Sequence, residues 1–153
     1  MDIQVVSYIA VDVAKDSLEI LIQGQKRSRS IANCKEALRR LLKSVQSLPG
    51  LHFICEASGG YERTLVNYLH DQDVCVSVVS PARVRSFANS EGVKAKTDPI
   101  DSKMLLNFAQ EKNPRPTQPP TPGRKALVAL MDRREHLSEQ LKREKTRLKN
   151  CDE

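Results

Sequence analysis

Three short apolar runs, separated by segments long enough for helices, limit this chain to an α/β fold. The runs are Val5–Val13, Leu51–Ala57 and Val74–Ser80. Each run is nearly free of charge, which is typical of strands that are buried on both faces of a sheet. Strand–helix–strand order implies parallel pairing with right-handed crossovers. These three runs therefore predict the parallel part of a sheet with helices packed on it.

Two further strands are expected between the first run and the first helix. Ser17–Gly24 alternates apolar and polar residues, and Lys26–Ala32 is polar and basic, as edge strands often are. Because only a few residues link them to each other and to the first run, an antiparallel meander is favoured. The fold class is therefore a mixed five-stranded sheet flanked by helices.

The helices are predicted from apolar residues that recur at helical spacing. Asn33 is expected to cap the first helix, and Tyr61–Gln72 forms the second. Pro81 opens the third at its first position, where a missing N–H has no cost. Asp98 opens a fourth helix.

The C-terminal part of the chain has a different composition. Five of the eight prolines fall within residues 112–123, which predicts a stiff linker. Residues 124–153 predict one long helix with leucines at heptad spacing, as in a coiled coil. We expect residues 1–111 to form a globular domain. The leucine stripe indicates that the helix pairs with a partner, such as a second copy of the chain.

The charge distribution favours a polyanionic partner such as nucleic acid. The chain has a net charge of +6; residues 1–111 carry 14 basic and 13 acidic groups, and residues 112–153 carry 11 and 6. No apolar run reaches the roughly 18 residues of a transmembrane helix, so no membrane association is expected. No basic region followed by an apolar stretch stands at the N-terminus of this sequence, so no secretory signal is expected. The cysteines form no CxxC pair, and we expect all four to be reduced in a cytoplasmic protein. They are Cys34, Cys55, Cys75 and Cys151.

Four carboxylates are candidates for a metal site. Asp12 lies in the first strand, Glu56 ends the fourth, and Asp98 and Asp101 open the last helix of the domain. Since the first and fourth strands are expected to be neighbours, their carboxylates face one point, and clustered carboxylates suit Mg²⁺ or Mn²⁺. An alternative interpretation is that Glu56 is simply solvated and that the Asp98/Asp101 pair caps its helix.

Basic side chains near the start of that helix are candidates for phosphate contacts. They are Arg83, Arg85, Lys94 and Lys96. A solvated basic face is the commoner meaning of such a group. Ser58-Gly59-Gly60 predicts a turn, with an anion site formed by its backbone N–H groups as the alternative.

The segments YIAVDVAKDSLEILI, CEASGGYE and KTDPIDS, in this order and spacing, resemble the N-terminal half of DEDD-type transposases of the insertion-sequence-110 class, which are related to Piv-type DNA invertases. The resemblance covers residues 5–111 closely and the tail more loosely. It implies a RuvC-like ribonuclease H fold.

The resemblance also implies a function. The four acidic family positions map onto Asp12, Glu56, Asp98 and Asp101, which bind divalent metal for strand cleavage and rejoining. The family is similar to recombinases that bind a structured guide RNA, and its long helix resembles the start of a segment that joins subunits. Full-length members carry a further domain with a nucleophilic serine, which this sequence does not match. We therefore expect a truncated product or a fragment that does not complete recombination alone.

These observations leave three hypotheses. The first is the catalytic-domain portion of an RNA-guided DNA transposase or recombinase. The second is a non-catalytic module that binds RNA or DNA and oligomerises through residues 124–153. The third is a stand-alone metal-dependent nuclease that cuts DNA junctions. An actin-like ATPase is disfavoured because no glycine-rich phosphate loop follows the first strand.

Overall fold

The computed structural model describes residues 6–92 and 98–149, except for the side chains of residues 98–101. The chain divides into two compact units, Met1–Thr117 and Gln118–Glu153. The first unit contains the whole sheet and all of the candidate site residues. The second contains one long helix.

The sheet of the first unit has five strands in the order β3-β2-β1-β4-β5. Antiparallel pairing joins β1 to β2 and β2 to β3, and parallel pairing joins β1 to β4 and β4 to β5. The predicted mixed five-stranded sheet is thus confirmed. The strands are β1 Ser7–Val13, β2 Ser17–Ile22, β3 Arg29–Ala32, β4 Leu51–Glu56 and β5 Cys75–Val79.

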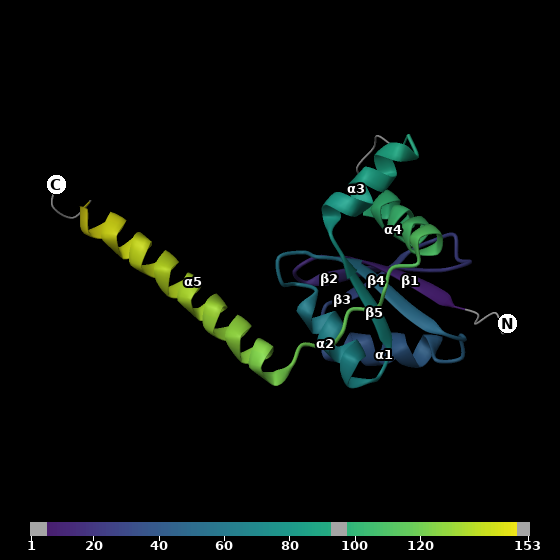
Figure 1. The fold of residues 1–153 in the computed structure, drawn as a ribbon, viewed down its shortest axis with the longest axis horizontal. Coiled ribbons are helices and arrows are strands. Elements are labelled where there is room, and N and C mark those ends of the chain that lie inside the picture. Colours follow the sequence, from purple (N-terminus) through teal and green to yellow (C-terminus); the bar gives the residue numbers. More distant parts are fainter. Residues whose placement is uncertain (1–5, 93–97, 150–153) are drawn as a thin grey trace. The chain divides into compact units, whose positions relative to one another are not determined.

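Four helices cover the two faces of this sheet (Figure 1). The helices α1 and α2 pack on one face, where Leu38 and Leu65 join a core with Ile9 of β1. The helices α3 and α4 cover the other face, where Phe87 and Phe108 join a second core. Their bounds are α1 Lys35–Val45, α2 Arg63–Asp71, α3 Pro81–Ser90 and α4 Asp98–Lys112.

The two cores explain why β1 is apolar at successive positions. Side chains alternate between the faces of a strand. Ile9 and Val11 belong to the α1–α2 core, while Tyr8 and Ala10 belong to the α3–α4 core. A strand that is covered on both faces cannot show an apolar–polar alternation.

The predicted cap of α1 is wrong. The N-cap residue is Cys34, which makes no side-chain capping hydrogen bond. The side-chain amide of Asn33 instead donates to the backbone oxygens of Ala14 and Tyr61, each at 3.1 Å. The side chain of Asn33 is therefore directed at neighbouring loops, and its oxygen, which a capping residue uses to accept N–H groups of the helix, makes no hydrogen bond among the described residues.

Part of the proline-rich segment packs on the open edge of β5. The N–H of Thr117 donates to the oxygen of Val76 at 2.8 Å, and its hydroxyl accepts the N–H of Val78 at 2.9 Å. The hydroxyl of Ser77 donates to the oxygen of Arg115 at 2.9 Å. These contacts satisfy backbone and side-chain groups that an open edge strand leaves exposed.

The second unit is the helix α5, Pro122–Lys149. Its heptad leucines are all exposed, at 47–68% of their surface. They are Leu127, Leu130, Leu137, Leu141 and Leu148. None of the helices in the described part of the chain combines the length and apolar character needed to span a membrane.

Candidate metal and nucleic-acid site

The register of the sheet brings Asp12 and Glu56 next to each other. In the parallel pair of β1 and β4, Val11 lies opposite Cys55, and the two carboxylates are the next residues along their strands. Both share strand parity with Ala10 and Ile54, which lie in the α3–α4 core. Asp12 and Glu56 therefore project toward the α3–α4 side at the carboxyl ends of two parallel strands, and both are partly exposed.

Helix α4 begins with Asp98 and has Asp101 in its first turn. The helix contacts β1, β2 and β4, so it lies over the face that carries Asp12 and Glu56. The side chains of Asp98 and Asp101 lie outside the described residues. Among the side chains that are described, no three His, Cys, Asp or Glu groups form a metal-binding cluster.

Glu19 is a third carboxylate on the same face, which the sequence analysis did not select. It lies directly opposite Asp12 in the antiparallel pair of β1 and β2. Like charges at opposed positions of neighbouring strands destabilise a sheet. The alternating pattern of β2 indicates the face on which Glu19 lies, because Glu19 and Leu21 are two residues apart and Leu21 belongs to the α3–α4 core.

The loop between β4 and α2 is held by Glu62. One carboxylate oxygen of Glu62 accepts the N–H of Ser58 at 3.0 Å, the Ser58 hydroxyl at 2.9 Å and the N–H of Gly60 at 2.9 Å. Burial raises the pKa of Glu62, but the hydrogen bonds from its own backbone, Ser58 and Gly60 outweigh it and hold the pKa below its usual value. The anion held by this turn is thus a side chain of the protein, three residues before Leu65 of the core.

Asn33 ties together the two loops that follow the candidate carboxylates. The oxygens that accept its amide belong to Ala14, just after β1, and to Tyr61, in the loop after β4. The third link is the Asn33 N–H, which donates to the oxygen of Asp16 at 3.0 Å. Asn33 therefore links the loops that follow Asp12 and Glu56, while the pairing of β1 with β4 sets the separation of the two residues.

The predicted phosphate-binding residues fall into two groups. Arg83 and Arg85 are exposed on α3, whereas Lys94 and Lys96 lie outside the described residues. The Arg83 guanidinium lies 5.7 Å from the ring centre of Phe108, and the Lys112 ammonium lies 5.4 Å from that of Phe87. The two cations line one shallow pocket of about 450 Å³ between α3 and α4.

The described cysteines are free thiols, namely Cys34, Cys55 and Cys75, and Cys151 lies outside the described residues. Burial, with smaller contributions from the charges of Glu62 and Glu56, raises the pKa of Cys55 to about 12. Cys55 therefore stays protonated and serves the core beside Glu56.

The family model of insertion-sequence-110 DEDD transposases, described as "Transposase", matches residues 9–151. The chain belongs to this transposase family. The resemblance noted in the sequence is thereby confirmed.

Two curated relatives of this transposase-family chain are the pilin gene-inverting proteins of Moraxella lacunata and Moraxella bovis. Each is 29% identical over 147 residues, which is 92% of this chain and 46% of the relative. The chain thus spans about half the length of the curated relatives it matches.

The fold of this family member is similar to that of T. thermophilus RuvC, solved in complex with a Holliday junction substrate. The TM-score is 0.51 at 12% identity, and the match covers 72% of this chain and 99% of the RuvC chain. The likeness confirms the predicted RuvC-like fold.

Proposed function

We propose that this chain provides the metal-binding part of the active site of a DNA transposase or recombinase that cuts and rejoins DNA. The strongest support is the adjacency of Asp12 and Glu56 on one face, at the carboxyl ends of neighbouring parallel strands. The proposed ligands of Mg²⁺ or Mn²⁺ are Asp12, Glu56, Asp98 and Asp101. The family membership and the pilin gene-inverting relatives support the reaction class.

The donor chemistry fits a hard divalent cation. Carboxylate oxygens are the preferred ligands of Mg²⁺ and Mn²⁺, and Asp12, Glu56 and Glu19 place three carboxylates on this face. A cation near Asp12 also offsets the repulsion from Glu19, which faces Asp12 across β1 and β2. When bound, the metal supplies Lewis-acid stabilisation of a phosphoryl group under attack.

The protein's own groups orient the substrate in this proposal. Arg83 and Arg85 project from α3, in the helical layer over the carboxylate face, and contact phosphates of the DNA, as do Lys94 and Lys96. Asn33 and Glu62 hold the loops that follow Asp12 and Glu56.

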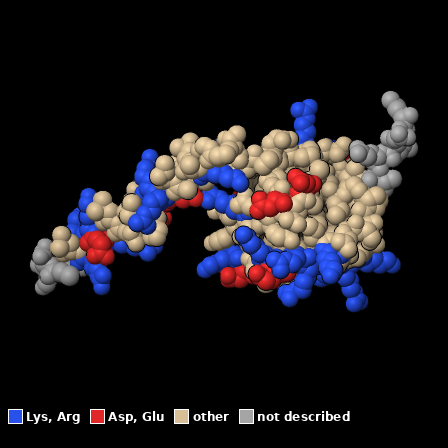
Figure 2. Space-filling view, turned by 90° about the horizontal axis from the view of Figure 1, so that it is seen from below, with Lys and Arg blue, Asp and Glu red and all other residues tan. Residues whose placement is uncertain are grey.

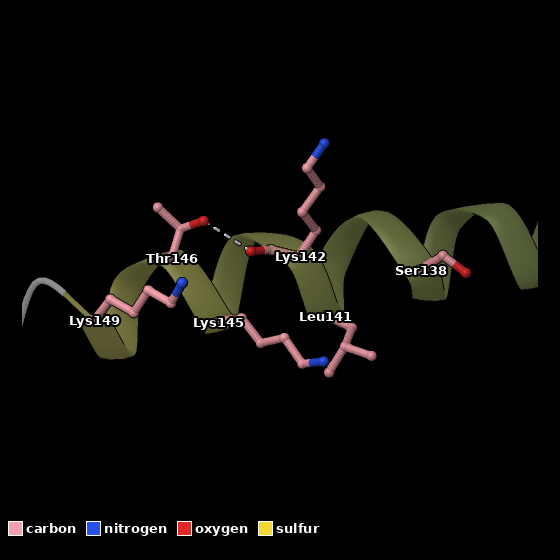
Figure 3. Close-up of a pocket in the computed structure, with 6 residues that line it drawn as sticks. All are labelled: Ser138, Leu141, Lys142, Lys145, Thr146 and Lys149. Atoms are coloured by element: carbon pink, nitrogen blue, oxygen red, sulfur yellow. Dashed lines mark hydrogen bonds between the residues drawn. The ribbon is translucent and has the colours of Figure 1, made fainter.

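A structured guide RNA and a second copy of the chain are the further proposed partners. The guide RNA rests on the similarity to RNA-guided recombinases. Self-association through residues 124–153 is supported by the exposed leucines of α5. Figure 3 shows Leu141 and Lys145 on the same side of the helix, while Lys142 points to the other side. Lysines that flank an apolar seam are typical of helices that pair.

A Mn²⁺ titration by calorimetry tests the proposed ligands. The whole chain is compared with Asp12→Asn and with the double variant Asp98→Asn/Asp101→Asn. Each variant is expected to bind Mn²⁺ at least about tenfold more weakly, since even indirect partners of a metal contribute that much. Asp71→Asn, an exposed position on α2, serves as the control. Unchanged affinity in Asp12→Asn contradicts the proposal.

A junction-cutting nuclease is the second candidate, favoured by the fold shared with RuvC. A nuclease would use the same carboxylates, so the metal titration does not distinguish it from the recombinase portion. Incubation of the chain with a four-way DNA junction and Mn²⁺ distinguishes the two candidates. Symmetrical nicks that disappear in Asp12→Asn support the nuclease, and an intact junction favours the recombinase portion or a non-catalytic binding module.

A further inference from the structure

The strand β3 and the helix α1 share a strongly basic surface that is separate from the candidate metal site. Residues 26–43 contain seven basic side chains and one acidic side chain, Glu36. All seven basic side chains are exposed. They are Lys26, Arg27, Arg29, Lys35, Arg39, Arg40 and Lys43. We call these seven residues the β3–α1 basic surface.

The burial pattern of α1 arranges part of this surface in a row. The helix buries Ala37, Leu38, Leu41 and Val45 against the sheet. Lys35, Arg39 and Lys43 recur every four residues on the exposed side, and the row spans about 12 Å at 1.5 Å per residue. Charge on one flank of a helix at this spacing forms a continuous stripe.

A direct contact joins the strand to the helix. The Arg29 guanidinium donates to the hydroxyl of Ser44 at 2.9 Å, and this hydroxyl donates to the oxygen of Leu41 at 2.7 Å. Figure 2 looks onto the face of the sheet that α1 and α2 cover. There, Lys and Arg side chains gather along the lower edge of the globular unit, around a smaller group of Asp and Glu.

The fold alone does not account for this surface. Lys26 and Arg29 discourage edge-to-edge pairing of β3. That function does not extend to α1, where like charges four residues apart, Lys35 with Arg39 and Arg39 with Lys43, destabilise the helix. Attraction of Arg39 and Arg40 to Glu36 offsets part of this repulsion, but seven basic side chains against one carboxylate leave an excess of positive charge that suits a partner of opposite charge.

We propose that the β3–α1 basic surface binds the phosphate backbone of double-stranded DNA. The inference rests on the proposed function, which supplies DNA as the polyanion. A duplex carries one negative charge per about 1.7 Å of its axis, so the length of duplex alongside the row on α1 carries about seven phosphate charges on its two strands together. The helix α1 packs on the face opposite Asp12 and Glu56. The DNA bound here is therefore either a second segment or a continuation of the DNA at the carboxylates that bends around the sheet.

The test is the salt dependence of duplex binding by the whole chain. The probe is a fluorescein-labelled duplex of about 20 base pairs, two helical turns, followed by fluorescence anisotropy. The variant Arg39→Gln/Lys43→Gln is compared with Arg115→Gln/Lys125→Gln, which removes the same charge from exposed positions beside β5 and near the start of α5. Each lost phosphate contact lowers the slope of log K against log salt by about 0.9.

The α1 variant is expected to lose about 1.8 from that slope, while the control pair keeps the parent slope. Its melting temperature should stay close to that of the parent, because the relief of two like-charge pairs on α1 is offset by the lost attraction of Arg39 to Glu36. Equal loss in both variants overturns the proposal, because attraction to the overall charge then explains binding. The proposal is also overturned if the α1 variant loses slope with an RNA duplex of matched sequence but not with the DNA duplex.

If the parent does not bind the duplex, the proposed DNA-binding role of the β3–α1 basic surface is wrong, but the proposed function is not affected. That function is judged by the Mn²⁺ titration, in which Arg39→Gln/Lys43→Gln is expected to behave as the parent does.

Discussion

Replacing Glu62 by alanine should destabilise the β4–α2 loop and weaken metal binding at the proposed site next to it. One oxygen of Glu62 accepts three hydrogen bonds of 2.9–3.0 Å from Ser58 and Gly60. A typical hydrogen bond contributes about 1 kcal/mol net, and water replaces part of that in a half-exposed loop. We therefore expect the free energy of unfolding to fall by about 2 kcal/mol in Glu62→Ala. Glu62→Gln keeps an acceptor but not the charge, and should lose about 1 kcal/mol.

Urea unfolding at neutral pH, followed by circular dichroism, measures these losses. The control is Glu111→Ala, because Glu111 is exposed on α4 and its contact with Lys112 is long, at 3.9 Å. A surface pair of this kind should contribute less than about 1 kcal/mol. In the Mn²⁺ titration, Glu62→Ala should bind about tenfold more weakly than the parent, since it fixes the loop after Glu56. If Glu62→Ala unfolds at the same urea concentration as the control, the loop does not depend on these hydrogen bonds.

The same contacts predict a pH dependence. Burial raises the pKa of Glu62, but its hydrogen bonds outweigh burial and the pKa in the folded protein is lowered. A group with a lowered pKa stabilises the fold above its unfolded pKa of about 4.3, and this contribution disappears as the pH falls through the folded pKa. The stability difference between the parent and Glu62→Gln should therefore shrink below about pH 4. A difference that stays constant to lower pH contradicts the reasoning.

Three further predictions concern other parts of the molecule. Asn33→Ala should leave the circular dichroism spectrum intact but weaken Mn²⁺ binding about tenfold, because the loops after Asp12 and Glu56 lose their shared donor; unchanged affinity argues against the tie. Burial lowers the pKa of His52, so the parent should lose stability as the pH falls below about 6.5, the unfolded value, and His52→Gln should lack that slope in urea unfolding. Leu130→Gln/Leu137→Gln should lower the sedimenting mass without changing the melting of the first unit; an unchanged mass excludes α5 as the contact between copies.

The sheet and its helices were predictable because burial on both faces leaves a direct mark on the sequence. Val11 and Cys55 lie in runs with almost no polar interruption, and only a strand covered by helices on both sides favours such a run. The strand order then followed from link lengths and crossover handedness. This strand order alone predicts that β1 and β4 are neighbours, and therefore that Asp12 and Glu56 are adjacent.

The polar contacts that support the site were not predictable from spacing. Asn33 precedes a helix, as a capping residue does, and nothing local distinguishes a cap from a side chain that reaches two distant loops. Glu62 is the last residue of a turn motif, and its role depends on the positive φ of Gly59 and Gly60, which aims the loop at its carboxylate. Glu19 was visible as a polar residue of an alternating strand, but its position opposite Asp12 requires the register of the pair.

The β3–α1 basic surface was likewise not predictable from the sequence. Along the sequence, its seven cations are divided between an edge strand and a helix, and each part has an ordinary structural explanation alone. The hydrogen bond between Arg29 and Ser44 joins the two elements in the folded chain, and this contact between them is not visible in the sequence. Since the candidate carboxylates lie on the other side, a chain that binds DNA through both surfaces must contact two separate DNA segments or one that bends around the sheet. Joining two segments is what recombination requires, so the salt dependence of the α1 variant bears on the reaction as well as on the surface.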